Sequence, residues 1–310
     1  MDKNQNKILQ SLENKNISTS TLNLYIKNLK RLNDGNEIKN LNFLKDSEKV
    51  LDKIKHLKPN TRKTYIISIV SLLKQDAKQK KLYDKYFTIL MDYNKDLKNN
   101  TTKSETQVEN WISQDDVKDI QQKIEDDIKP KLINKKLTDS EFSQLLNLMV
   151  LSLYTLNPPR RNLDYQYAVV VKKYNDSMDD KYNYVDLEKN EFHFNNFKTK
   201  KTYQRQTVPI NEDLRKIIDE YLKFHPLIKN LKKKDGIIPF LVNAKGDPFE
   251  STNTITRILN KIFGKKIGSS MLRNIYLTSK YGNENKEKQE DALKMGTSTT
   301  TADQNYIKLD

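Results

Sequence analysis

The sequence contains no cysteine and only three histidines, and both shortages limit the chemistry that the chain can perform. Without cysteine, neither a disulfide bond nor a thiolate metal site can form. The three histidines, His56, His193 and His225, are not near neighbours in the sequence. We therefore do not expect a histidine-based metal site either.

Long apolar runs and glycine-rich phosphate loops are missing as well. No run of about 18 apolar residues occurs, so we expect no membrane-spanning segment. Residues 1–16 lack the apolar core of a signal peptide, which predicts an intracellular rather than a secreted protein. The absence of a glycine-rich phosphate-binding loop argues against a nucleotide-dependent motor or kinase.

Positive charge, by contrast, is abundant. The 310 residues include 56 Lys and Arg against 41 Asp and Glu, which gives a net charge of +15. An excess of this size indicates a polyanionic partner, most often a nucleic acid. The alternative explanation is an AT-rich genome, which favours lysine and asparagine. The chain is long enough for two domains of ordinary size.

Apolar residues recur at helical spacing near the N-terminus and predict an all-helical domain over residues 1–97. Residues 18–33 form the first such segment, with Ser20 as the expected N-cap. Pro59 begins a later helix. Basic residues lie between the apolar positions and form either a solvated helix face or a surface for a DNA backbone: Lys27, Lys30, Arg31, Arg62 and Lys63.

A polar stretch without periodicity follows. We interpret residues 98–108 as a linker to a second domain over residues 109–310. A long apolar helix is expected over residues 142–156, and helical spacing returns towards the C-terminus. Between them, residues 184–210 alternate between apolar and polar side chains, which predicts two or three antiparallel strands with a basic turn. The sequence thus predicts a mostly α fold with a small antiparallel sheet.

The segment PPRRNLDY, residues 158–165, is the first of four features with functional groups in the second domain. It predicts a helix whose first turn holds Arg160 and Arg161. Arginines at a helix N-terminus can present a planar fork to a phosphate beside free backbone N–H groups. Asp164 could orient the fork, although a surface salt bridge that caps a helix would use the same residues.

Three further features follow along the chain. In the turn FKTKKTYQRQ, Lys198 or Lys201 could enter a DNA groove and protonate an oxygen, although a solubilising turn would look similar. Arg273 is a charge within an apolar helical stretch and needs either an anion or a buried ion-pair partner. Tyr306, in the closing stretch MGTSTTTADQNYIKLD, is either a nucleophile or an aromatic residue on a loosely ordered terminus.

In this order, the features resemble those of the tyrosine recombinase family, the phage-type integrases, over most of the chain. Residues 161–164 (Arg-Asn-Leu-Asp) match the Arg-x-x-Glu/Asp motif of the first family arginine, Arg161 here. Residues 208–210 (Val-Pro-Ile) match the strand end after the hairpin of the catalytic lysine. The resemblance assigns that role to Lys198, with Lys201 as the alternative.

Two more motifs complete the resemblance. Residues 270–273 (Ser-Met-Leu-Arg) match a His-x-x-Arg box that ends in the second arginine, Arg273. Residues 295–298 (Met-Gly-Thr-Ser) precede Tyr306 at the spacing of the family nucleophile. PPRR and the terminal YIK also look like the versions carried by large DNA viruses and their satellites.

The resemblance implies a helical core-binding domain and an α+β catalytic domain of a site-specific recombinase or integrase. Tyr306 would form a 3′-phosphotyrosyl link, Arg161 and Arg273 would hold the phosphate oxygens, and Lys198 would protonate the leaving 5′ oxygen. Neither a metal nor another cofactor is required. The implied partner is double-stranded DNA, bound by a homo-oligomer (a tetramer), in the cytoplasm, the nucleus or a viral factory.

Two positions depart from the family pattern. Ser270 and Thr297 stand where the family has histidines. Their hydroxyl groups can contact a phosphate oxygen but cannot exchange a proton near neutral pH as imidazole does. Two alternatives therefore stay open: a DNA-binding relative that has lost catalysis, and a type IB topoisomerase, which uses related residues to relax supercoils.

Overall fold

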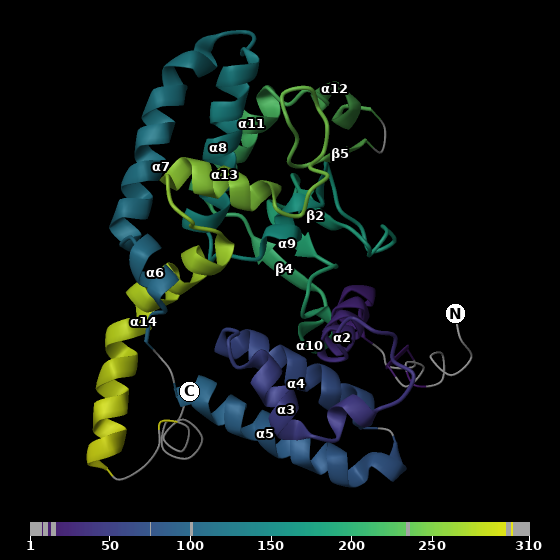
Figure 1. Cartoon of the computed structure of the whole chain (residues 1–310). Coiled ribbons are helices and arrows are strands. Elements are labelled where there is room, and N and C mark those ends of the chain that lie inside the picture. The colour runs from purple at the N-terminus through teal and green to yellow at the C-terminus, as the bar shows by residue number, and fades with distance from the viewer. Residues whose placement is uncertain are drawn as a thin grey trace. The chain divides into compact units, whose positions relative to one another are not determined.

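The computed structural model describes residues 8, 12–13, 17–74, 76–99, 102–233, 236–295 and 299. The described chain is mostly helical with one small sheet, which confirms the predicted fold class (Figure 1). Within the described residues, every helix is too short or too polar to span a membrane.

The chain divides into two compact units, Met1–Thr102 and Lys103–Asp310. The boundary between them lies inside residues 98–108, the segment that we interpreted as a linker. The end of that segment is helical, however, because α6 (Glu105–Asn110) begins with a capping box between Ser104 and Gln107. Its polar composition conceals this short helix from a search for apolar periodicity.

The first unit consists of short and long helices. Ser18, rather than the predicted Ser20, caps its first long helix, because Ser18 Oγ accepts a hydrogen bond from the N–H of Thr21 at 3.2 Å. Pro59 occupies the first position of its helix, where a missing N–H costs no hydrogen bond. The elements are α2 (Thr19–Leu32), η1 (Asn42–Leu44), α3 (Ser47–Ile54), α4 (Pro59–Leu73), η2 (Ala77–Gln79) and α5 (Lys80–Asn99).

Helices α2 and α4 are joined by polar as well as apolar contacts. The buried Asn28 donates a hydrogen bond to Ser68 Oγ at 3.1 Å, and Arg31 donates one to the Tyr65 hydroxyl at 3.4 Å. Leu29 is fully buried in the same core. The basic residues that sequence analysis noted on these two segments therefore lie on one pair of neighbouring helices.

The second unit contains the remaining helices and the sheet. Helices α7 and α8 run side by side (Figure 1), and each begins with a capping box, at Ser113 and Thr138 respectively. The helices after α6 are α7 (Gln114–Ile128), η3 (Lys129–Ile133), α8 (Asp139–Thr155), α9 (Asn162–Gln166), α10 (Lys200–Tyr203), α11 (Glu212–Lys223), α12 (Ile228–Leu231), α13 (Thr254–Phe263) and α14 (Ser269–Lys294).

The sheet has the strand order β4-β3-β2-β1-β5. Of the two or three antiparallel strands predicted within residues 184–210, the structure has three, and β3 pairs antiparallel with both β2 and β4. Strand β1 pairs parallel with β2, so the whole sheet is mixed. Its members are β1 (Ala168–Val171), β2 (Asn183–Asp186), β3 (Glu191–Phe194), β4 (Gln206–Pro209) and β5 (Ile237–Pro239).

Aromatic packing fixes α9 against the sheet. The fully buried Tyr165 of α9 contacts Phe192 and Phe194 of β3 edge to face, with ring centroids 5.7 and 5.8 Å apart. The ring of Tyr154, on α8, packs edge-on against Tyr165 from another side. The short helix that follows the PPRR motif is thereby held by the main core of the unit.

Candidate active site

The PPRR segment approaches α9 in an extended conformation. Arg161 is the N-cap of α9, with φ −77° and ψ 151°, so Arg160 and Arg161 precede the first helical turn instead of lying within it as predicted. Asp164 occupies that first turn, and its N–H donates to the Arg161 carbonyl at 3.0 Å. The backbone of Arg161 is thus fixed by the start of the helix, and its side chain projects from there.

Asp164 pairs with a different arginine from the one expected. Its Oδ2 accepts a hydrogen bond from Arg160 Nε at 3.0 Å, so the expected orientation of the Arg161 fork by Asp164 is corrected. The side chain of Asp164 is only 3% exposed. Burial raises the pKa of Asp164 above its ordinary value, and the adjacent guanidinium of Arg160 acts against that rise.

Arg160 is engaged on several sides at once. Its Nη1 donates to Gln206 Oε1 of β4 at 2.9 Å. Its Cζ lies 3.8 Å from the ring centroid of Phe194 and 5.2 Å from that of Phe197. With 19% of its side chain exposed, Arg160 ties the start of α9 to both strands of the β3–β4 hairpin.

Arg161, by contrast, is half-buried, and its guanidinium forms no hydrogen bond or ion pair with the part of the chain that the structure describes. The two neighbouring arginines therefore differ in kind. Arg160 is bound within the protein, whereas the donors of Arg161 are available to an external anion.

The residue after Arg161 connects this segment to the C-terminal helices. Asn162 Nδ2 donates to Thr256 Oγ1 of α13 at 2.8 Å, and the Asn162 Oδ1 accepts from the Tyr154 hydroxyl at 2.8 Å. Thr256 in turn lines a pocket of about 320 Å³ together with Ser270 and Asn274 from the first turns of α14. The Arg161 segment and the start of α14 therefore both adjoin Thr256.

The start of α14 holds the predicted second arginine. Ser270 is exposed in the first turn, and Arg273 is half-buried one turn later. Leu277, which belongs to the apolar stretch around Arg273 in the sequence, is 50% exposed in the structure. A buried structural ion pair was the alternative for Arg273, but the described residues offer it no acidic partner.

The β3–β4 turn spans residues 195–205 and contains α10. Lys198 directly follows Phe197, is exposed, and has no hydrogen bond or ion pair with any residue in the described ranges. Lys200 instead pairs with Asp180 at 2.6 Å. Lys201, on α10, is already engaged in an interaction within the chain. Of these lysines, Lys198 is the one whose proton is free for use on a ligand.

Thr297 and Tyr306 lie outside the described residues. The residues next to Arg161 thus contact two other segments: Arg160 contacts the hairpin that carries Lys198, and Asn162 bonds to Thr256, which lines a pocket with the start of α14.

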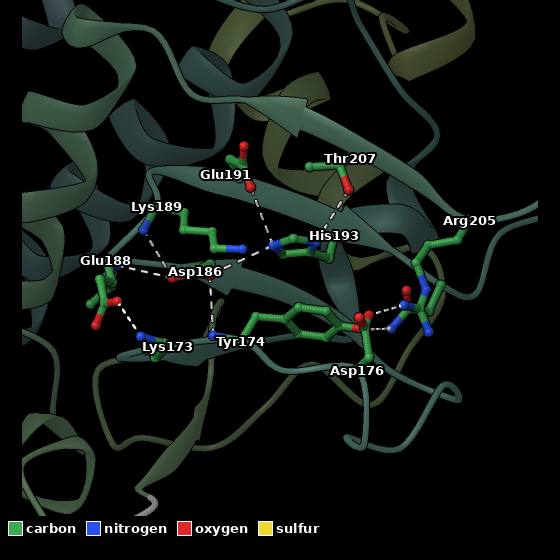
Figure 2. A network of polar contacts seen from close by, with 12 residues as sticks. Lys173, Tyr174, Asp176, Asp186, Glu188, Lys189, Glu191, His193, Arg205 and Thr207 are labelled. Atoms are coloured by element: carbon green, nitrogen blue, oxygen red, sulfur yellow. Dashed lines mark hydrogen bonds and ion pairs between the residues drawn. The ribbon is translucent and has the colours of Figure 1, made fainter.

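Figure 2 shows a second polar cluster, on β2 and the segment after β1, that sequence analysis missed. Asp186 is fully buried and accepts hydrogen bonds from the N–H groups of Tyr174, Glu188 and Lys189 at 3.0 to 3.1 Å. A carboxylate whose oxygens accept hydrogen bonds from backbone N–H groups in this way anchors a turn. An aspartate at the end of an apolar strand, before the polar residues Glu188–Asn190, is the signal that could have revealed it.

His193 adjoins this carboxylate. Its ring stacks on Tyr174 with centroids 4.0 Å apart, and its Nε2 lies 3.7 Å from Asp186 Oδ2 and 3.6 Å from Glu191 Oε2 (Figure 2). Burial lowers the pKa of His193, and the two carboxylates act against that fall. Arg205 Cζ lies 5.7 Å from the centroid of the Tyr174 ring, within cation–π range. This cluster supports the loop between β1 and β2, which contacts the β3–β4 hairpin through Arg205.

A scan against protein-family models, a search of curated proteins and a search of solved structures found no match to the chain. The functional argument accordingly depends on the residues and on their arrangement.

Proposed function

We propose that the chain is a site-specific DNA recombinase that cuts and rejoins DNA through a 3′-phosphotyrosyl link to Tyr306. The observation that carries the proposal is the contrast between neighbouring cations. Arg160 and Lys200 are bound by internal carboxylates, whereas Arg161, Arg273 and Lys198 have no such partner within the described residues. Free cations on three connected segments are suited to one shared anion.

The shared anion in this proposal is the scissile phosphate. Arg161 and Arg273 bind its two non-bridging oxygens and stabilise the charge that develops as the phosphorus becomes five-coordinate. The Tyr306 oxygen forms a bond to phosphorus while the bond from phosphorus to the 5′ oxygen breaks. Lys198 gives its proton to that leaving oxygen, and the phenolic proton of Tyr306 passes to solvent. The reverse step, with a second DNA strand, conserves the phosphate bond.

Ser270 and Thr297 enter this scheme as hydrogen-bond donors to the same phosphate. Because neither can accept a proton near neutral pH, no side chain of the proposed site acts as a base for Tyr306. A free tyrosine has a pKa of about 10, so strand cleavage should accelerate as the pH rises from 7 towards 9.

Binding of double-stranded DNA would involve both units. The basic residues on the neighbouring helices α2 and α4 are suited to contact a phosphate backbone, with Lys27 and Arg31 exposed and Lys30, Arg62 and Lys63 half-buried. Strand exchange joins two DNA duplexes, so we further propose that the chain acts as a homo-oligomer, a tetramer as in the family that it resembles.

The test is a covalent-adduct assay. Sheared DNA of the source genome is incubated with the protein, the reaction is stopped with detergent, and protein-linked DNA is isolated and sequenced to define the cleaved site. We expect an adduct with wild type and none with Tyr306→Phe, which should bind DNA equally well. Binding without any adduct would favour the DNA-binding relative that lacks catalysis. Relaxation of a plasmid without strand exchange would favour the topoisomerase.

A further inference from the structure

One side chain holds both ends of the turn that carries Lys198. Phe197 lies at the beginning of this turn and Gln206 follows its end. Arg160 contacts both residues: its guanidinium lies over the Phe197 ring at 5.2 Å, and its Nη1 donates to Gln206 Oε1 at 2.9 Å. The separation of the two ends of this basic turn is thereby set from outside the hairpin.

Arg160 is itself rigidly held. Its Nε bonds to the buried carboxylate of Asp164, and the ring of Phe194, only 3.8 Å from Cζ, covers part of the guanidinium. An arginine that is fixed at two nitrogens and stacked on an aromatic ring loses little further entropy when it positions a neighbour. Two of its nitrogens already donate within the chain, and the paired carboxylate of Asp164 offsets its charge, so Arg160 is less suited to bind a phosphate than Arg161 is.

Lys198 needs such support because it has none of its own. Its ammonium group makes no hydrogen bond or ion pair with the described part of the chain, so the backbone next to Phe197 alone determines its location. On the outer side of the turn, Asp180 holds Lys200, and Asp176 forms an ion pair with Arg205 (Figure 2). The turn is thus restrained at several residues, and Lys198 is the cation left to act.

We propose that Arg160 is a positioning residue that holds the Lys198 hairpin against the Arg161 segment, and so aims the Lys198 proton at the leaving 5′ oxygen. The proposal rests on the proposed recombinase function. It separates the two adjacent arginines by role: Arg161 binds the phosphate, whereas Arg160 acts only through Lys198. Its loss should therefore impair the protonation step and leave stabilisation of the non-bridging oxygens intact.

The test uses the cleaved site defined above, prepared with sulfur in place of the bridging 5′ oxygen. A thiol has a pKa of about 8.5, so a thiolate leaves without being protonated and makes a general acid unnecessary. On ordinary DNA, we expect Arg160→Ala and Lys198→Ala each to slow adduct formation by about 10²-fold. On the sulfur-containing DNA, both variants should return to within a few-fold of wild type.

Two controls define the comparison. Arg161→Ala should stay slow on both substrates, because sulfur does not replace a donor to the non-bridging oxygens. Arg215→Ala removes an arginine that also bonds to a carboxylate and to a second acceptor, namely Asp219 at 2.8 Å and the Leu187 carbonyl at 2.8 Å. Leu187 lies in the turn between β2 and β3, away from the turn that carries Lys198. We expect this variant to show no preference for the sulfur-containing substrate beyond that of wild type.

Arg160→Ala leaves buried Asp164 unpaired, so Gln206→Ala provides a second variant, which removes one hydrogen bond from Arg160 to the hairpin and keeps the pair with Asp164. It should show a smaller loss with the same recovery on sulfur-containing DNA. Recovery of Lys198→Ala without recovery of Arg160→Ala and Gln206→Ala overturns the inference, as does wild-type speed of both on ordinary DNA. Absence of any wild-type adduct would instead refute the proposed function itself.

Discussion

Replacing Asp164 by alanine tests the most constrained contact of the candidate site. The carboxylate is 3% exposed and the Arg160 side chain is 19% exposed, so the deletion leaves a largely buried guanidinium without its anion. Breaking a buried pair in this way typically costs about 3–5 kcal/mol. Because Arg160 keeps its bond to Gln206 and some solvent contact, we expect a loss near 3 kcal/mol. Asp164→Asn retains an acceptor for Arg160 Nε and should cost about 1–2 kcal/mol.

Urea unfolding followed by tryptophan fluorescence measures this loss. The chain has a single tryptophan, Trp111, which lies in the second unit and so reports on the unit that contains Asp164. Asp219→Ala is the matched control: it breaks the Arg215–Asp219 pair, whose carboxylate is 54% exposed, and should cost no more than about 1 kcal/mol. If Asp164→Ala proves as mild as Asp219→Ala, the anchoring of Arg160 by a buried carboxylate is refuted.

Three further predictions concern acid stability, catalysis and DNA binding. Burial lowers the pKa of His225 from 6.5 to about 4, so the unfolded chain binds a proton that the folded chain does not. The contribution of His225 to the free energy of unfolding should be fully present above pH 6.5 and should fall by about 3 kcal/mol by pH 4. Thermal melts across this pH range should show a smaller fall for His225→Gln than for wild type. Arg161→Ala should reduce the rate of adduct formation by about 10²–10³-fold, whereas Arg257→Ala, on α13, should leave it within a few-fold of wild type. Lys27→Ala and Lys63→Ala should each lower the salt dependence of duplex binding by about 0.9 in log–log slope; an unchanged slope would remove these residues from the DNA surface.

The helices and the hairpin follow from local sequence signals. Apolar periodicity predicts α2, α4 and α8, and alternation predicts the strands within residues 184–210. Strand β1 (Ala-Val-Val-Val) is a continuous apolar run without alternation, and the edge strand β5 has only three residues, so neither carries such a pattern. The pairing of β1 with β2, and of β5 with β1, depends on contacts between separate segments of the chain.

The PPRR motif shows where local reasoning ends. Spacing alone allows Asp164 to pair with either Arg160 or Arg161. The choice is decided by Gln206 and Phe194, which are distant in sequence and which draw the Arg160 guanidinium towards the hairpin. The same contacts distinguish the two arginines by role, and no sequence pattern within residues 158–165 contains that information.

The most direct test of the account is detergent trapping of the protein on its cleaved DNA site, followed by mass spectrometry of the DNA-linked peptide. The account predicts a nucleotide bound through a 3′-phosphate to Tyr306, and no adduct from Tyr306→Phe. A linkage to another residue, or an equal yield of adduct from Tyr306→Phe, would contradict it.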